Sequence, residues 1–316
     1  MTSYHTLSHP ERQHKCEIDK VANITPSNAF RFLSIAEMDL EASAMLYERG
    51  LYTQAVFLFQ QSVEKATKSF GFHFCGLSEA DVRSGNKVGH MTIRVFERSA
   101  EKAFNEMLVV KESIESEPEI QVLFELTGCD LSLLVDGFQL IISRLNEISK
   151  EHHKYRSLSS EDIKNTLLSL QEVEDRIANA QNHIHEGSYL SIDIEAIKKD
   201  VYLRLEPVFT AYPEESVDIK KGVDELLDLV AKERFWRELI APCCELAAAI
   251  LSLFYLSFVM QPHAIASRYP DEDFDPMEFY TEELPLTQYM PQLYSIADKT
   301  IKRLYVSYDT IKLEDS

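Results

Sequence analysis

Apolar residues recur at helical spacing in the first third of the chain, beginning just after Pro26 and Ser27. Ser27 is a suitable N-cap, because its hydroxyl can accept a hydrogen bond from a free amide of the first helical turn. The apolar positions of this first predicted helix are Phe32, Ile35, Ala36, Leu40, Met45 and Leu46. Gly50 fits the position that ends the helix, where glycine takes up a left-handed conformation without steric strain.

A second helix is predicted to begin at Leu51 or Tyr52. Its apolar positions again keep helical spacing: Tyr52, Ala55, Val56, Phe59, Val63, Ala66 and Phe70. Its polar face carries Gln60, Gln61, Glu64, Lys65 and Lys68. The link between the two helices is so short that they must pack antiparallel.

The rest of the chain also predicts helices, because only 9 Gly and 11 Pro interrupt its 316 residues. After a loop at 76–89, a third helix is expected from about His90. Ser159 and Asp162 resemble a capping box for another helix, which we expect to break at 183–188. Further helices are expected at 131–148, 190–206, 216–233, 234–260 and 287–311. The predicted fold class is all-α, an antiparallel helical bundle.

One segment requires a membrane check. Residues 246–267 contain no Asp, Glu, Lys or Arg, and the first fifteen of them are strongly apolar. A membrane-spanning helix needs roughly 20 apolar residues and usually has basic flanks. We therefore expect a helix buried in the bundle, and no membrane contact. Residues 1–20 lack the apolar core of a signal peptide, so a cytoplasmic location is expected.

The formal charge of −20 is unevenly distributed along the chain. Residues 1–105 hold 12 Lys or Arg and 12 Asp or Glu, whereas 106–235 hold 14 against 27. Nucleic-acid binding depends on neutralising phosphates, so only the N-terminal third is suited to a polyanion. The five cysteines are scattered without a C-x-x-C pair, and we expect reduced thiols, no metal site and no cofactor.

Two separated blocks of sequence carry a family resemblance. The first block contains Ala36-Glu-Met-Asp39-Leu40, Gly50-Leu-Tyr52-Thr-Gln-Ala55, Gln60-Gln61-Ser-Val-Glu64-Lys65-Ala66-Thr-Lys68 and Gly89-His90. It resembles the opening helix pair of HEPN domains, with their A-x-x-D-L, G-x-Y-x-x-A and Q-Q-x-x-E-K-A-x-K signatures. The second block, Ser267-Arg268-Tyr269-Pro270-Asp271, resembles the segment before the last helix of the same domain.

The resemblance implies a small helical bundle, commonly dimeric, and suggests a division of the chain. We expect a disordered tail at 1–24, the first part of a HEPN bundle at 25–105, an acidic helical insertion at 106–233 and the closing helices at 234–316. Many HEPN domains are metal-independent ribonucleases of toxin–antitoxin and antiphage systems. Others are inactive modules that bind nucleotides or RNA.

Active members of the family use an Arg followed, after four to six residues, by a His. The His moves a proton at the RNA 2′-hydroxyl or the leaving oxygen, and the Arg stabilises charge on the phosphate. Arg83 and His90 have this spacing, in a glycine-rich loop of the charge-neutral third. Arg176 and His183 have it too, within the acidic segment. Each pair also has a non-catalytic interpretation, with His90 as a capping or packing residue and His183 at the end of a solvated helix.

The family's catalytic motif normally lies near the start of the last core helix, but here Arg268 has no His after it. This departure favours a non-catalytic protein. Arg268 and Asp271 are expected to form an ion pair or to touch a ligand phosphate. Lys65 and Lys68 are the other candidates for ligand binding.

Two interpretations of the function stay open. In the first, the chain is a HEPN-type protein of nucleotide or RNA biology, a defence or toxin–antitoxin component whose ribonuclease activity is unproven. In the second, it is a non-catalytic helical module that binds a nucleotide, or a protein partner through the acidic insertion. The family resemblance also implies a homodimer.

Overall fold

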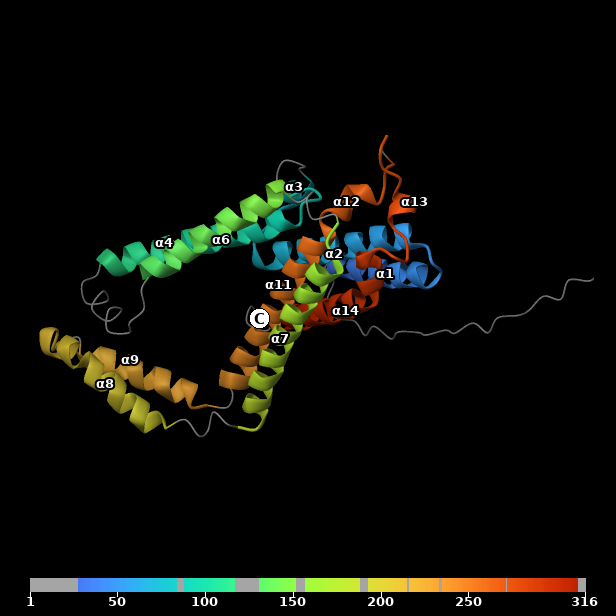
Figure 1. The fold of residues 1–316 in the computed structure, drawn as a ribbon. Coiled ribbons are helices and arrows are strands. Elements are labelled where there is room, and N and C mark those ends of the chain that lie inside the picture. Colours follow the sequence, from blue (N-terminus) through green and yellow to red (C-terminus); the bar gives the residue numbers. More distant parts are fainter. Residues whose placement is uncertain are drawn as a thin grey trace, which may run out of the picture.

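The computed structural model describes residues 28–83, 88–116, 131–151, 157–187, 193–214, 216–232, 235–270 and 272–311. These residues form helices and no β-strand, which confirms the predicted all-α class (Figure 1). The elements are α1 (Asn28–Glu48), α2 (Tyr52–Phe74), α3 (Glu79–Arg83), α4 (Ile93–Ser116), α6 (Leu131–Glu151), α7 (Ser160–His185), α8 (Ile194–Ala211), α9 (Ser216–Val230), the π-helical turn η3 (Trp236–Ile240), α11 (Ala241–Met260), α12 (His263–Ala266), α13 (Pro276–Phe279) and α14 (Pro285–Ile311).

Helices α1 and α2 form the antiparallel pair that the sequence predicts, joined by a tight turn at Gly50. Gly50 has a φ of +72°, and its amide donates to the carbonyl of Tyr47 at 2.9 Å. The amide of Leu51 donates to the carbonyl of Leu46 at 3.0 Å. These bonds satisfy carbonyls at the end of α1 in the arrangement that a left-handed glycine permits. Gly50 is therefore the helix-ending residue expected from the sequence.

Small residues line the contact between α1 and α2 at seven-residue intervals. Three serine hydroxyls cross the contact to backbone carbonyls: Ser43 to Ala55 at 2.6 Å, Ser62 to Ala36 at 2.7 Å and Ser69 to Ala29 at 2.6 Å. Because these side chains are short, the two backbones approach closely while every one of these buried hydroxyls still has an acceptor.

This contact corrects the predicted apolar face of the first helix. Ala36 and Leu40 are buried as expected, but Ile35 and Met45 are 44 % and 58 % exposed. They point away from the core because the row of small residues, rather than the larger apolar side chains, faces α2.

Helices α11 and α14 close the bundle over the α1–α2 pair. Two tyrosines of α14 reach the serines of the contact: the hydroxyl of Tyr294 lies 2.8 Å from Oγ of Ser43, and that of Tyr308 lies 2.9 Å from Oγ of Ser69. Burial raises the pKa of both phenols above its usual value, so both stay neutral.

Helix α11 is buried along its second half only. Its buried residues all lie between Ala248 and Met260, and η3 before it has none. Within the described parts of the chain, the stretch Trp236–Met260 is the one helix long and apolar enough to cross a membrane, by length and composition alone. The expected burial in the bundle is thus confirmed for the second half, whereas the first half is only partly covered.

The remaining long helices form two hairpins that project from the bundle, α4 with α6 and α8 with α9 (Figure 1). Helix α7 packs against α11 and α14. Arg303 of α14 ties these helices together, because its guanidinium pairs with Glu174 of α7 and Glu245 of α11. Helix α4 runs through residue 105 without a break, and the division into a bundle and an insertion stays a prediction.

Helix α7 begins with the predicted capping box. The amide of Asp162 donates to Oγ of Ser159 at 3.1 Å, and the amide of Ser159 donates to Oδ2 of Asp162 at 3.0 Å. The predicted break at 183–188 is confirmed, because α7 ends at His185, inside this range, and Gly187 follows with a φ of +68°.

Candidate functional site

The polar face of α2 is largely buried and forms a chain of hydrogen bonds along the helix. Glu64 is at its centre: it accepts a hydrogen bond from Nε2 of Gln60 at 3.1 Å and one from Nζ of Lys68 at 2.6 Å. Gln60, Glu64 and Lys68 are 1 %, 4 % and 7 % exposed. A buried carboxylate is tolerated only when it is paired and hydrogen-bonded, and Gln60 and Lys68 meet that need.

His90 joins this cluster from the loop before α4. Its Nδ1 lies 3.1 and 3.2 Å from the two carboxylate oxygens of Glu64. A carboxylate accepts hydrogen bonds, so we assign the proton of the neutral ring to Nδ1 and the lone pair to Nε2. The side chain of His90 is 57 % exposed. Since Nδ1 faces the buried Glu64, the exposed side of the ring is the one that carries Nε2.

Glu64 is held in its charged form. Burial by itself raises the pKa of this carboxyl, but the charge and hydrogen bond of Lys68 and the hydrogen bond of Gln60 outweigh burial, so the pKa lies below its usual value. A charged Glu64 fixes the orientation of His90, as carboxylates do for the imidazole of catalytic triads.

Gln261, directly after α11, holds the backbone around His90. Its Nε2 donates to the carbonyl of His90 at 2.9 Å, and its Oε1 accepts from the amide of Thr92 at 2.6 Å. Gly89 precedes His90 with a φ of +50°, a conformation that favours glycine. These contacts keep His90 outside α4, which begins at Ile93 rather than at the predicted position.

Both lysines predicted to bind a ligand have carboxylate partners. Lys65 pairs with Asp39 of α1, which joins the E-K and A-x-x-D-L signatures across the contact between the two helices. Lys68 pairs with Glu64. A ligand phosphate would have to compete with these partners for either lysine.

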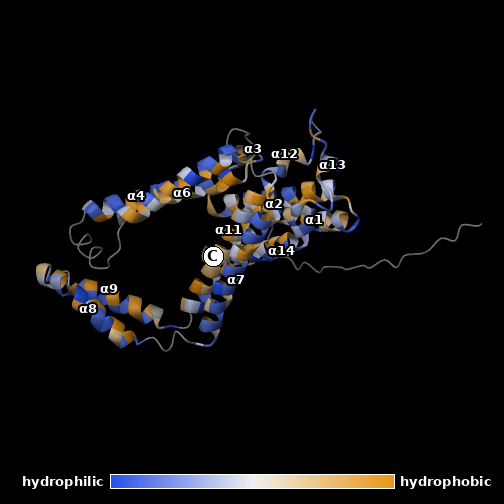
Figure 2. Cartoon of the chain, viewed as in Figure 1, coloured by the Kyte–Doolittle hydropathy of each residue, from blue (hydrophilic) through white to orange (hydrophobic). Residues whose placement is uncertain are grey.

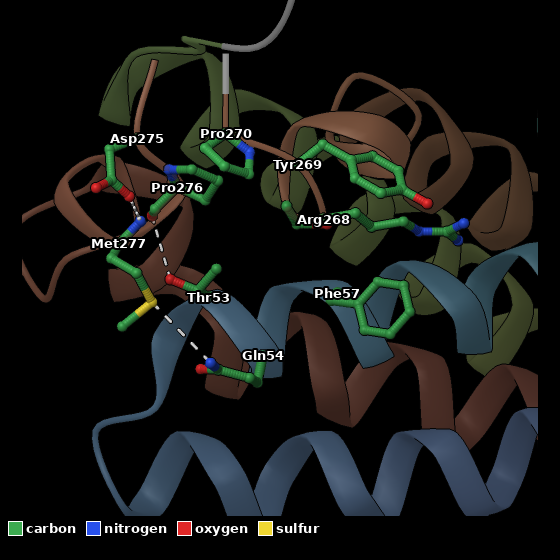
Figure 3. A pocket seen from close by; sticks show the side chains of 10 residues that line it. Thr53, Gln54, Phe57, Arg268, Tyr269, Pro270, Asp275, Pro276 and Met277 are labelled. Carbon is green, nitrogen blue, oxygen red and sulfur yellow. Dashed lines mark hydrogen bonds between the residues drawn. The ribbon is translucent and has the colours of Figure 1, made fainter. Parts of the chain in front are cut away.

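A pocket of about 550 Å³ lies between the first turns of α2 and residues 267–270 and 275–277 (Figure 3). The guanidinium carbon of Arg268 lies 4.7 Å from the centre of the Phe57 ring, and Tyr269 beside it is 64 % exposed. The Nε of Arg268 is buried, and no atom of the described residues accepts a hydrogen bond from it. The pocket therefore combines aromatic surfaces with a cation whose hydrogen-bonding capacity is not fully used.

Helix α13 fixes one wall of this pocket. Oγ1 of Thr53 donates to the carbonyl of Pro276 at 3.1 Å, and Asp275 caps α13 by accepting from the amide of Met277 at 2.7 Å (Figure 3).

His263, the last histidine of the chain, is 1 % exposed, and its Nδ1 lies 2.8 Å from the hydroxyl of Tyr280. His263 is therefore a core residue.

The pocket and the His90–Glu64 pair lie on one face of α2. Phe57 and Glu64 are seven residues apart, which places their side chains on the same side of a helix. Seven residues rise by about 10 Å along the helix axis, so the two contacts are about two turns apart. Arg268 and His90, predicted from distant parts of the sequence, are thus brought to the same helix face.

Other predicted site residues are not joined in this way. Arg176 and His183 are exposed on α7, which is helical through both, so about 10 Å of helix axis separates them. The side chain of Arg83 and the whole of Asp271 lie outside the described residues, so the Arg83–His90 and Arg268–Asp271 pairs stay predictions.

Three contributors to this face are absent from the sequence prediction: Phe57, Gln261 and Glu64 as the partner of His90. The seven-residue spacing of Phe57 and Glu64 is a usable signal, since it places both on one side of a helix. No comparable signal exists for Gln261, which contacts residues about 170 positions earlier in the chain.

Cysteine and acidic side chains do not form a metal site in the described part of the chain, where no group of three or more His, Cys, Asp or Glu could hold an ion. Burial raises the pKa of the Cys75 and Cys244 thiols, which keeps them neutral. Cys16 and Cys129 lie outside the described residues.

Comparison with protein-family models bears directly on α1 and α2. The model of the HEPN domain matches residues 29–84, a range that contains the A-x-x-D-L and Q-Q-x-x-E-K-A-x-K signatures. Comparisons with curated proteins and with solved structures found no match. The match confirms the predicted HEPN resemblance for residues 29–84, which contain the α1–α2 pair, and it does not extend to the second block at 267–271.

Proposed function

We propose that this protein binds single-stranded RNA along the face of α2 that carries Phe57 and Glu64. A HEPN domain indicates a function related to nucleotides or RNA. The observation that carries the proposal is the shared helix face: Arg268 contacts Phe57 and His90 contacts Glu64, and these two positions of α2 are about 10 Å apart along the axis. A short stretch of single strand spans this separation.

The Arg268 end of the face is suited to a nucleotide unit. A guanidinium is permanently charged and binds phosphate through a planar fork of N–H donors. Among the described residues Arg268 pairs with no carboxylate, and its Nε has no acceptor. The exposed ring of Tyr269 offers a surface on which a base can stack. A phosphate at Arg268 and a base against Tyr269 would use both groups.

The His90 end supplies a general base. Nε2 accepts the proton of a ribose 2′-hydroxyl while the 2′-oxygen bonds to phosphorus and the bond from phosphorus to the 5′-oxygen breaks. Water protonates the leaving oxygen, and the products are a 2′,3′-cyclic phosphate and a 5′-hydroxyl. The charged Glu64 stabilises the imidazolium that forms. RNA cleavage, and the defence or toxin–antitoxin role implied by the family, belong to this proposal.

Fluorescence anisotropy with a labelled single-stranded RNA tests binding, and gel analysis of the same RNA tests cleavage. Arg268→Lys keeps the charge but removes the planar fork, so we expect affinity to fall about tenfold. His90→Gln should abolish cleavage and leave affinity within about twofold. His183→Ala removes an exposed histidine of α7 and should change neither quantity.

Three results would contradict parts of this proposal. Absent binding, or binding unaffected by Arg268→Lys, contradicts the RNA site. Binding that depends on Arg268 without any cleavage contradicts the catalytic role of His90 but leaves the RNA site in place. Cleavage that survives His90→Gln assigns the chemistry to another residue. The homodimer implied by the family is tested separately by light scattering at increasing protein concentration.

A further inference from the structure

The helices of the two projecting hairpins alternate between hydrophobic and hydrophilic residues (Figure 2), and several of their large apolar side chains are exposed. On α9 the side facing α8 is polar as well as apolar: Asp224 accepts a hydrogen bond from the hydroxyl of Tyr202 at 2.6 Å, and Nζ of Lys220 lies 4.5 Å from the centre of the Phe209 ring. The opposite side carries apolar residues at intervals of three and four, here named the α9 stripe: Ile219, Gly222, Leu226 and Leu229. Two of them, Leu226 and Leu229, are 58 % and 43 % exposed.

Helix α6 repeats this arrangement on the other hairpin. Its buried side contains Val135 and Leu145, and α6 packs against α4. On the other side lies the α6 stripe, which consists of Gly137, Leu140 and Ile141. Leu140 and Ile141 are 60 % and 49 % exposed. Both hairpins therefore have a second apolar surface in addition to the one that holds the hairpin together.

Each stripe contains a glycine that the chain itself does not require. Gly137 and Gly222 lie inside helices, and neither has a positive φ. A β-carbon added at either position meets no atom within 4 Å. Glycine weakens a helix interior relative to alanine. A glycine at such a position, within an exposed apolar stripe, allows another helix to approach the backbone closely.

Acidic residues flank both stripes, and they indicate the charge of the helix that would bind there. Glu225 and Glu147 are neutralised by cations of their own helices. Asp218 beside the α9 stripe and Asp136 beside the α6 stripe are exposed and pair with no cation in the described part of the chain. An apolar surface with a negative rim is complementary to an apolar helix face with a positive rim.

We propose that each hairpin binds an amphipathic helix of a partner protein, with its apolar face on the stripe and its flanking Lys or Arg side chains on the acidic rim. A second copy of this chain fits poorly, because a symmetric contact would place each acidic rim against itself. This surface is distinct from the RNA face on α2, and the inference does not depend on it.

The test uses two synthetic peptides of about 20 residues with the same leucine face, one flanked by Lys and the other by Glu, titrated against the full chain. We expect the Lys peptide to bind at least tenfold more tightly than the Glu peptide. Gly137→Leu and Gly222→Leu combined should weaken binding of the Lys peptide at least tenfold, while the melting temperature stays the same or rises. Ser143→Leu, at an exposed position of α6 outside the stripe, is the control and should leave binding unchanged.

Equal binding of the two peptides would overturn the proposed partner chemistry. Binding of the Lys peptide that survives the double glycine variant would overturn the assignment to the stripes. Light scattering tests the other possible occupant, a second copy of this chain. A dimer of the unmodified chain that dissociates in the glycine variant would show that a second copy covers the stripes, and this would contradict the proposal. RNA affinity should be unchanged in that variant, so failure here is distinguishable from failure of the RNA site.

Discussion

Glu64 accepts a hydrogen bond from Nδ1 of His90 at 3.1 Å, although the two residues are 26 positions apart in the chain. Glu64 is also bonded to Lys68, so one buried carboxylate joins the interior of α2 to the loop before α4. This contact gives Glu64 and Lys68 of the Q-Q-x-x-E-K-A-x-K signature and His90 of the Gly-His signature one shared physical arrangement. The carboxylate anchors the imidazole, and the left-handed Gly89 allows the loop to present it.

Removing the charge of Glu64 should destabilise the fold. Glu64→Gln leaves Lys68 buried without a counter-charge, and we expect the free energy of unfolding to fall by about 3–5 kcal/mol. Asp39→Asn breaks the less buried pair with Lys65 and should reduce it by at most about 1 kcal/mol. Chemical denaturation at neutral pH measures both. Equal losses for the two variants would contradict the central place of Glu64.

The contribution of Glu64 should also depend on pH. Its folded-state pKa lies below the unfolded value, which is near 4.5, so its ionised form stabilises the folded chain. The stabilisation is fully present above the unfolded pKa and is lost as the pH falls through the folded pKa. The stability difference between the unmodified chain and Glu64→Gln should therefore be constant near neutral pH and narrow in acid. Denaturation at a series of pH values checks this, and a difference that widens in acid would give the opposite sign.

Adding volume at the contact between α1 and α2 should be far more damaging than changing the residue next to it. Ala36 is fully buried, and its carbonyl accepts the hydroxyl of Ser62. Ala36→Leu forces the backbones apart and should destabilise by about 1–3 kcal/mol. Ile35→Ala, at a 44 % exposed position, should change stability by about 0.5 kcal/mol or less. Thermal or chemical denaturation measures both changes in stability. A larger loss for Ile35→Ala than for Ala36→Leu would show that Ile35 faces the core.

Two glycines should respond in opposite directions to alanine. Gly50 has a φ of +72°, so Gly50→Ala strains the backbone and should destabilise by about 1–2 kcal/mol. Gly222 lies inside α9 with open space around it, and Gly222→Ala should stabilise by about 0.5–1 kcal/mol. The comparison of their unfolding midpoints tests both assignments, and a loss of stability at Gly222 would show that the chain itself needs that glycine.

Local signals in the sequence are sufficient for the helices and for some of their ends, although α4 begins three residues later than predicted. The turn at Gly50 and the capping box of Ser159 with Asp162 depend on neighbouring residues, and both are present in the structure. The core face of α1 is predicted only in part, because hydrophobicity alone ranks Ile35 and Met45 above Ser43. Only the partner helix makes a serine the better core residue, by offering a carbonyl acceptor at close range.

The candidate site is predicted only in part, for a related reason. His90 and Arg268 are identifiable from motifs, but their partners come from other helices and from positions remote in the chain. In the sequence, Glu64 is one of several polar residues on a helix face that is expected to meet solvent. In the folded chain, α11 and the loop before α4 cover it. The pairing of Arg268 with Phe57 depends on how α12 and α13 return to the start of α2.

The salt dependence of RNA binding tests the central claim most directly. Each phosphate neutralised on a single strand contributes a slope of about −0.7 to the plot of log affinity against log salt concentration. Arg268→Gln should weaken binding and make that slope shallower by about 0.7, whereas His90→Gln should leave the slope unchanged. If RNA binding is absent, or if Arg268→Gln keeps the slope of the unmodified chain, the α2 face is not where this protein holds RNA.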